Sequence, residues 1–235
     1  MELLMSEFKY QSISTDKDVF RLVFFLHGYT SNADDVMPYA QTLATYLKHT
    51  LIIIPESDMV SERRDDKKQW YALYDLDPNK RRRMPETPTA DIIEIYNKTG
   101  NRISAVAKRL NRFISELQKK HHIRNKNTFI MGFSQGAMLA IYAGLTRRYN
   151  LGGIFPFAGI VCGKDLLEKE ITARPEVYLF HGTKDLSVQF KTLEFTKEWL
   201  EQHNISWAAI EYDGIEHKLT EEEMADAAEI INRSC

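Results

Sequence analysis

Short runs of β-branched and aromatic residues alternate along the chain with longer stretches that have a helical period. The runs are almost continuously apolar, which is typical of strands buried on both faces of a parallel sheet. The strands expected from them are Phe20–Leu26, Thr50–Ile54, Thr128–Met131, Gly153–Phe157, Val177–Phe180 and Trp207–Tyr212. A further, weakly patterned strand is expected near Phe8–Ser14.

The stretches between these runs place apolar residues at the spacing of an amphipathic helix. The expected helices are Ala33–Leu47, Lys98–His121, Gln135–Arg147, Val188–Gln202 and Glu221–Asn232. The last of them follows Thr220 and has Glu223 three residues later, which is the pattern of a capping box. This alternation of strands and helices predicts an α/β protein with a mostly parallel, doubly wound sheet and helices on both faces.

One segment, Pro55–Asn97, breaks the alternation because neither period can be followed through it. It holds the charge runs Glu62–Lys68 and Lys80–Arg83. Long segments of this kind inside a compact domain are often lids or binding loops. We therefore expect one domain over residues 1–235 with a long loop or lid insertion at about residues 55–97, and a plain surface insertion is the alternative.

Composition narrows the class of protein. The chain has 31 Lys and Arg against 33 Asp and Glu, so no global charge favours nucleic acid or an anionic membrane. Cys162 and Cys235 are too few for a disulfide framework, which favours a reducing compartment. Met1–Tyr10 lacks the pattern of a signal peptide, and no apolar run is long enough to span a bilayer. We therefore expect a soluble, cytoplasmic protein with no transmembrane segment.

The strongest chemical signal is the sequence Gly-Phe-Ser-Gln-Gly at Gly132–Gly136, between the expected strand Thr128–Met131 and the helical stretch that follows. A G-x-S-x-G motif between a strand and a helix is typical of a nucleophile elbow, in which a strained serine projects its hydroxyl. Glycines are needed two residues to either side because side chains there would meet the neighbouring backbone. Ser134 is thus the expected nucleophile.

A serine hydroxyl needs a base, and His181, His203 and His217 are the histidines that follow Ser134. His203 ends an amphipathic helix and is expected to be a solvated cap, whereas His181 ends a strand before Gly182 and is expected to be structural. When a G-x-S-x-G serine comes first in the chain, its acid and then its histidine follow. His217 lies in the loop after the last expected strand, which is the place for that histidine. His217 is therefore the expected base.

The acid that orients the base is expected at the carboxyl end of a neighbouring strand. Asp185 lies in the loop after the strand Val177–Phe180, and Asp213 is a rival that is closer to His217 in sequence. Asp213 precedes Gly214 in a turn, where aspartate is a common residue, so Asp185 ranks first. The backbone N–H groups of Tyr29, after the first core strand, and of Gln135 are the expected oxyanion hole.

Taken together, these motifs resemble the phospholipase/carboxylesterase family, which includes the acyl-protein thioesterases and small bacterial carboxylesterases. The resemblance rests on the following segments of the sequence: His27-Gly28, Gly132–Ala137, His181–Asp185 and Gly214–His217. It implies an α/β-hydrolase fold and hydrolysis of a carboxylic ester or thioester through an acyl-enzyme, without metal or organic cofactor. The substrate would be a small ester or thioester or an acylated lipid or protein; a homodimer is compatible with the sequence.

Two features qualify this resemblance. The segment Pro55–Asn97 is polar and basic where acyl-protein thioesterases carry a more apolar loop, which favours a short-chain or unidentified ester over long-chain protein deacylation. Trp70, after Pro55, looks like the family's tryptophan near the pocket and is expected to form an apolar wall; an anchor for the loop is the alternative. A serine peptidase or amidase, or a non-catalytic binding protein on the same scaffold, also stays open.

Overall fold

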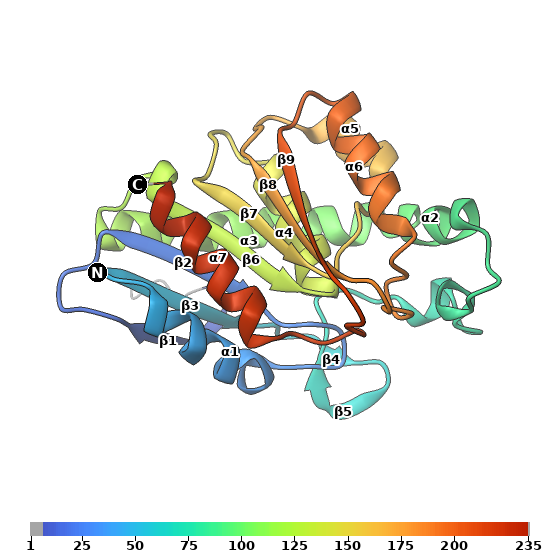
Figure 1. Cartoon of the computed structure of the whole chain (residues 1–235), viewed down its shortest axis with the longest axis horizontal. Coiled ribbons are helices and arrows are strands. Elements are labelled where there is room, and N and C mark those ends of the chain that lie inside the picture. The colour runs from blue at the N-terminus through green and yellow to red at the C-terminus, as the bar shows by residue number, and fades with distance from the viewer. Residues whose placement is uncertain (1–6, 235) are drawn as a thin grey trace.

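The computed structural model describes residues 7–234 and is built around a seven-stranded sheet (Figure 1). In spatial order its strands are β1 (Lys9–Ser14), β3 (Thr50–Glu56), β2 (Arg21–Leu26), β6 (Thr128–Phe133), β7 (Gly153–Phe157), β8 (Val177–Gly182) and β9 (Trp207–Tyr212). Strand β1 runs antiparallel to β3, and all the other neighbours are parallel. The predicted mostly parallel sheet is thereby confirmed, including the weakly patterned first strand.

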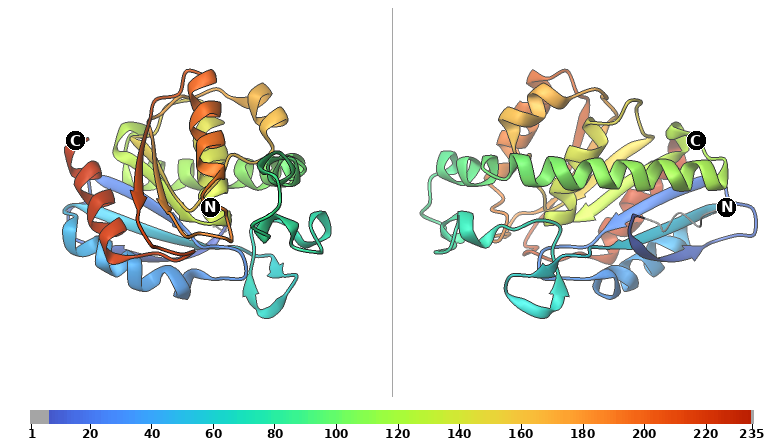
Figure 2. Two further views of the ribbon diagram at one scale, coloured as in Figure 1. Left: turned by 45° about the vertical axis from the view of Figure 1, so that its right-hand side comes forward. Right: turned by 180° about the vertical axis from the view of Figure 1, so that it is seen from behind.

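Helices cover both faces of this sheet. Helices α1 (Ala33–Tyr46) and α7 (Glu221–Arg233) lie together on the face that is turned to the viewer in Figure 1. On the opposite face, α3 (Gly100–His121) runs across the sheet in the right-hand view of Figure 2 and packs against α4 (Gln135–Leu145). Helix α6 (Thr192–Gln202) contributes to the same opposite core.

The apolar strand runs explain this layering. Side chains alternate between the two faces of a strand, so a sheet covered on both sides needs apolar residues at every position. In β2, Val23 and Phe25 join the core beneath α1 and α7, whereas Leu22, Phe24 and Leu26 join the core beneath α3 and α4. Within residues 7–234, every helix is too short or too polar to cross a membrane.

The segment Pro55–Asn97 has more local structure than its sequence pattern indicates. Strand β3 continues to Glu56, and the remainder contains the hairpin β4 (Val60–Ser61) and β5 (Arg64–Lys68), 3-10 turns at Tyr74–Leu76 and Arg81–Arg83, and helix α2 (Thr89–Asn97). Asp77 stabilises the 3-10 turn at Arg81–Arg83. Its carboxylate accepts the backbone N–H groups of Arg81 and Arg82 and pairs with the Arg82 guanidinium at 2.6 Å. Side-chain to backbone bonds of this kind carry no hydrophobic period, so the pattern did not reveal them.

Other boundaries differ by a few residues from the expected ones. The helix expected from Val188 begins at Thr192, because Asp185 binds the backbone amides of Ser187 and Val188 in the preceding loop. The short helix α5 (Lys164–Glu170) was not predicted, and Leu167 is its one buried residue. A single buried position gives no period to detect.

Candidate active site

Ser134 occupies a sharp turn between β6 and α4, with φ 55° and ψ −115°. A positive φ is rare for a residue with a side chain and is a mark of stored strain. The flanking glycines make the turn possible. A Cβ on Gly132 would overlap the backbone of Gly136, and a Cβ on Gly136 would lie 2.5 Å from the carbonyl oxygens of Leu26 and His27. The turn therefore requires glycine at both positions.

His217 and Asp185 reach this serine from the loops after β9 and β8. The Nε2 atom of His217 lies 3.0 Å from the Ser134 Oγ, and its Nδ1 lies 2.7 Å from Asp185 Oδ2. An ionised carboxylate can only accept, so Nδ1 carries the proton and Nε2 is left to accept from the serine hydroxyl. The three side chains come together because parallel strands direct their carboxyl ends to one edge of the sheet.

The carboxylate of Asp185 is buried and held at both oxygens. Its Oδ1 accepts the backbone N–H groups of Ser187 at 2.7 Å and Val188 at 3.0 Å. Burial raises the pKa of this carboxyl, but the hydrogen bonds from His181 and His217 outweigh burial and lower the pKa to about 2. The group is thus an anion that faces the His217 imidazole.

The rival residues lie elsewhere. Asp213 is exposed and accepts a hydrogen bond from the Thr183 hydroxyl at 3.1 Å, not from His217. His203 donates from Nδ1 to the backbone oxygen of Trp199 at 2.7 Å and stacks on the indole of that residue. His181 is buried and lies 3.5 Å from the carboxylate of Asp185. Its Nε2 also donates to the Val188 backbone oxygen at 2.9 Å, so it supports the loop that holds the acid.

The two expected oxyanion donors lie beside the serine. Tyr29 and Gln135 both line the small cavity that contains Ser134. Among the described residues, neither backbone N–H has a hydrogen-bond acceptor, so both are available to a ligand. The Gln135 side chain is occupied, because it accepts from the backbone N–H of Trp70 at 2.8 Å and donates to the Tyr71 carbonyl at 2.8 Å.

This serine cavity is narrow. It is lined by Tyr29, Leu73, Arg82, Arg83, Tyr96, Ser134, Gln135, Met138, Ser187 and Val188. Its volume of about 10 Å³ is roughly what one water molecule needs. The basic run Lys80–Arg83 is visible in the sequence, but its position beside the serine is not, because nothing in a polar loop indicates which side chains will line a cavity.

Trp70 is not one of the residues that line the serine cavity. It is 1% exposed and belongs to the core beneath α3. Its indole Nε1 donates to the His27 backbone oxygen at 2.8 Å, and its ring stacks on the His27 imidazole with centroids 4.7 Å apart. This position differs from the expected pocket wall and favours the alternative, an anchor that ties the segment Pro55–Asn97 to the end of β2.

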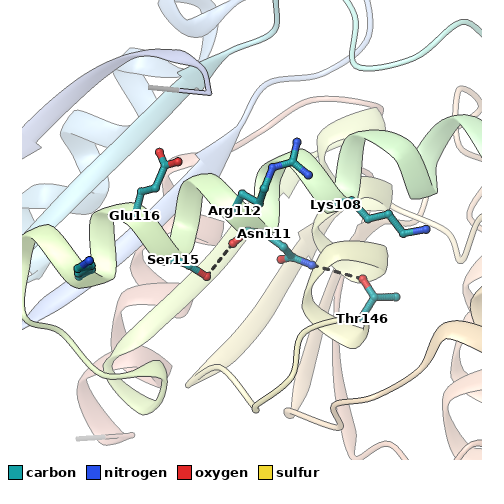
Figure 3. Close-up of a pocket in the computed structure, with 7 residues that line it drawn as sticks. Lys108, Asn111, Arg112, Ser115, Glu116 and Thr146 are labelled. Atoms are coloured by element: carbon teal, nitrogen blue, oxygen red, sulfur yellow. Dashed lines mark hydrogen bonds between the residues drawn. The ribbon is translucent and has the colours of Figure 1, made fainter. Parts of the chain in front are cut away.

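A larger hollow lies on the outer surface of α3, with a volume of about 620 Å³ (Figure 3). Several of its lining side chains already form hydrogen bonds within the protein, and Figure 3 shows Asn111 turned toward Thr146. The Asn111 amide donates to the Thr146 hydroxyl at 3.4 Å, and the Ser115 hydroxyl donates to the Asn111 backbone oxygen at 2.8 Å. No histidine lines this hollow, so Ser115 has no base beside it.

Several proteins of known class are similar to this chain. The acyl-protein thioesterase 1 of Kluyveromyces lactis is 28% identical over 138 residues, which cover 56% of this chain and 60% of the relative. That of Saccharomyces cerevisiae is 27% identical over 119 residues, which cover 48% of this chain and 52% of the relative. The chain therefore spans less than two thirds of the length of these curated relatives.

Solved structures match over almost the whole chain. Esterase PE8 has a TM-score of 0.81 and 23% identity, covering 97% of this chain and 99% of its own. SOBER1 of Arabidopsis thaliana has a TM-score of 0.73 and 16% identity, covering 91% of this chain and 98% of its own. These similarities confirm the α/β-hydrolase fold. A model of the phospholipase/carboxylesterase family matches residues 10–235, and the chain belongs to that family.

Proposed function

We propose that the protein is a serine hydrolase that cleaves carboxylic esters or thioesters through an acyl-enzyme on Ser134. The observation that carries the proposal is the line of hydrogen bonds from Ser134 through His217 to Asp185, at 3.0 and 2.7 Å. A serine at this distance from an oriented imidazole can lose its proton as it attacks a carbonyl carbon. A buried carboxylate beside the imidazole stabilises the imidazolium that forms.

The reaction would proceed in two steps. His217 takes the hydroxyl proton while Ser134 Oγ bonds to the carbonyl carbon, and then returns the proton to the leaving alcohol or thiol. In the second step His217 takes a proton from water as the water attacks the acyl carbon; the bond to Ser134 Oγ then breaks, Oγ receives that proton from His217, and the acid product leaves. The backbone N–H groups of Tyr29 and Gln135 would stabilise the oxyanion in both steps, a contribution typically worth about 3–4 kcal/mol for each donor.

The proposed substrates have short acyl chains. The serine cavity has a volume of only about 10 Å³ and is walled by the buried side chains of Arg82, Tyr96 and Met138. A long alkyl chain would need these side chains to move, whereas an acetyl or propionyl group needs only a small displacement. We therefore expect activity to decline with acyl length beyond about four carbons, because the cavity is far smaller than the pockets of hundreds of Å³ that bury larger ligands.

Labelling with a fluorophosphonate tests the nucleophile. We expect the wild type to be labelled on Ser134 and to hydrolyse 4-nitrophenyl acetate, and Ser134→Ala to lose both properties, with activity reduced on the order of 10⁴-fold. Ser115→Ala is the matched control, since Ser115 lies on α3 with its hydroxyl bonded to its own helix, and it should behave as wild type. Labelling that persists in Ser134→Ala would disprove the proposal.

A further inference from the structure

A second cavity adjoins the serine cavity, and its lining is strongly basic. It has a volume of about 280 Å³ and is lined by Tyr29, Thr30, Arg63, Arg64, Lys80 and Arg83. Tyr29 and Arg83 also line the serine cavity, so the two spaces share a wall. The residues of this basic pocket come from the loop after β2, from the β4–β5 hairpin and from the 3-10 turn at Arg81–Arg83.

Most of the positive charge in the basic pocket has no counterion. Arg64 pairs with Asp66 at 2.7 Å, but Arg63, Lys80 and Arg83 form no ion pair with any carboxylate of the described residues. The neighbouring carboxylate of Glu62 accepts at Oε2 from the Tyr29 hydroxyl and from the backbone amides of residues 73 and 74, and it forms no ion pair with these three cations. Three cationic side chains are therefore available to an anion that enters the pocket.

The three arginines of the 3-10 turn Arg81–Arg83 have different surroundings. Arg81 is exposed and pairs with Asp91 at 2.7 Å, and Arg82 is buried and pairs with Asp77 at 2.6 Å. Arg83 alone of the three is left without a carboxylate in the described part of the chain. Its side chain is exposed at the rim of the pocket, and partial desolvation together with the like charge of Arg82 lowers the pKa of its guanidinium.

A group of like charges with no counterion is electrostatically unfavourable, and a bound anion would relieve the repulsion. Guanidinium groups bind carboxylate and phosphate in a bidentate manner, through paired N–H donors that match two oxygens. The pocket is also too polar to attract an alkyl chain. Its chemistry therefore fits an oxyanion and does not fit the acyl tail of a lipid.

We propose that the basic pocket binds an anionic group, a carboxylate or a phosphate, of the same substrate whose ester or thioester carbonyl lies at Ser134. This inference rests on the proposed hydrolase function and adds the substrate class to it. The anion would hold one end of the substrate at Arg63 and Arg83 while the shared wall at Tyr29 keeps the carbonyl beside the serine. Binding of the anion, although it is distant from the bond that breaks, would then help to orient the carbonyl group for attack by the serine.

The anionic group could belong to the acyl part of the substrate or to its leaving group. Two matched pairs of substrates distinguish these two positions. The acyl-side pair is mono(4-nitrophenyl) glutarate and its methyl ester, which differ by one charge. The leaving-group pair is 2-acetoxyethyl phosphate and 2-acetoxyethanol. For each pair the measured quantity is the ratio of kcat/KM, anionic over neutral, after subtraction of the uncatalysed rate.

For the wild type we expect a ratio of at least about 10 in one of the two pairs, in keeping with one charge-assisted bidentate contact. The ratio should fall by about 3- to 10-fold in Arg63→Gln and in Arg83→Gln, and it should also fall with added salt. Arg81→Gln is the matched control, because its guanidinium pairs with Asp91 outside the pocket. Because each ratio compares two substrates in one preparation, partial misfolding cancels.

The outcomes separate the two proposals. If the wild type hydrolyses the neutral esters but shows a ratio of one or less in both pairs, the basic pocket does not select an anion and this inference is wrong. A ratio above 10 that survives in both Arg63→Gln and Arg83→Gln also overturns it. If no ester is hydrolysed and Ser134 resists the fluorophosphonate, the hydrolase function itself fails.

Discussion

Replacement of Asp185 by asparagine is the sharpest test of how His217 is oriented. In the native site, Oδ1 of Asp185 accepts two backbone N–H groups and Oδ2 accepts the Nδ1 proton of His217 at 2.7 Å. An asparagine oxygen can keep both backbone bonds, so its NH₂ group then faces Nδ1. Two donors cannot bond to each other, and His217 would shift its proton to Nε2.

The size of the effect follows from that tautomer. With the proton on Nε2, His217 cannot accept the hydroxyl proton of Ser134, and it loses the anion that stabilises its charged form. The expected loss in kcat is on the order of 10⁴-fold, equal to about 5 kcal/mol of transition-state free energy. The pKa of the Asp185 carboxyl is lowered to about 2, so Asp185 is ionised in the wild type at every assay pH above about 4. The loss of activity in Asp185→Asn should therefore be seen throughout that range.

The assay is steady-state hydrolysis of 4-nitrophenyl acetate, with circular dichroism to follow the thermal transition. Asp213→Asn is the matched control, because Asp213 is an exposed aspartate that accepts only the Thr183 hydroxyl. It should keep at least about half of the wild-type rate, as exposed substitutions are close to neutral. Fluorophosphonate labelling of the folded Asp185→Asn variant should be slow but should still occur at Ser134.

Two results would refute this reasoning. One is an Asp185→Asn variant that keeps more than about a tenth of wild-type kcat, since the tautomer argument requires a far larger loss. The other is equal damage from Asp213→Asn, which would make Asp213 the acid. A fall in both activity and melting temperature for Asp185→Asn alone would show instead that the backbone bonds of Oδ1 were lost.

Three further predictions concern stability. Trp70→Ala should cost about 3–5 kcal/mol in urea unfolding and slow all esters alike; an altered acyl-length preference at unchanged melting temperature would favour the pocket wall. Gly136→Ala should cost about 1–3 kcal/mol or more, because its Cβ would lie 2.5 Å from two backbone oxygens; unchanged unfolding would contradict the steric argument. Burial raises the pKa of Glu223 to about 7, so the folded state holds its proton more tightly, and the free energy of unfolding should fall by about 3 kcal/mol between pH 4.5 and 7. Glu223→Gln should lack this decline, and a parallel pH profile for both proteins would disprove it.

Periodicity predicted the sheet and its covering helices because these elements bury continuous apolar faces. The runs that became β2, β6 and β7 are apolar at nearly every position, which a sheet covered on both sides requires. The nucleophile turn was also predictable, because the close backbone contacts at Gly132 and Gly136 leave no room for a Cβ atom. Helix α5 and the β4–β5 hairpin were not predicted, because few of their side chains are buried and they therefore show no hydrophobic period.

The candidate site was predictable in part for the same reason. His217 and Asp185 follow strands, so topology limits where they can lie, and the structure brings both to Ser134. The burial of Trp70 depends on a hydrogen bond to a backbone atom distant in sequence, the His27 carbonyl, and the burial of Arg82 depends on its pair with Asp77. Such partners leave no periodic signal in the sequence and become apparent only in the folded structure.

The separation of the three hydrogen-bonded side chains along the chain bears on how the protein folds. Ser134 and His217 are 83 residues apart, and Asp185 and His217 are 32 apart. Contacts this distant in sequence form late, because loop closure must precede them. Regain of the Ser134–His217 contact after dilution from denaturant should therefore lag behind the return of helical circular dichroism, since β8 and β9 must first join the sheet.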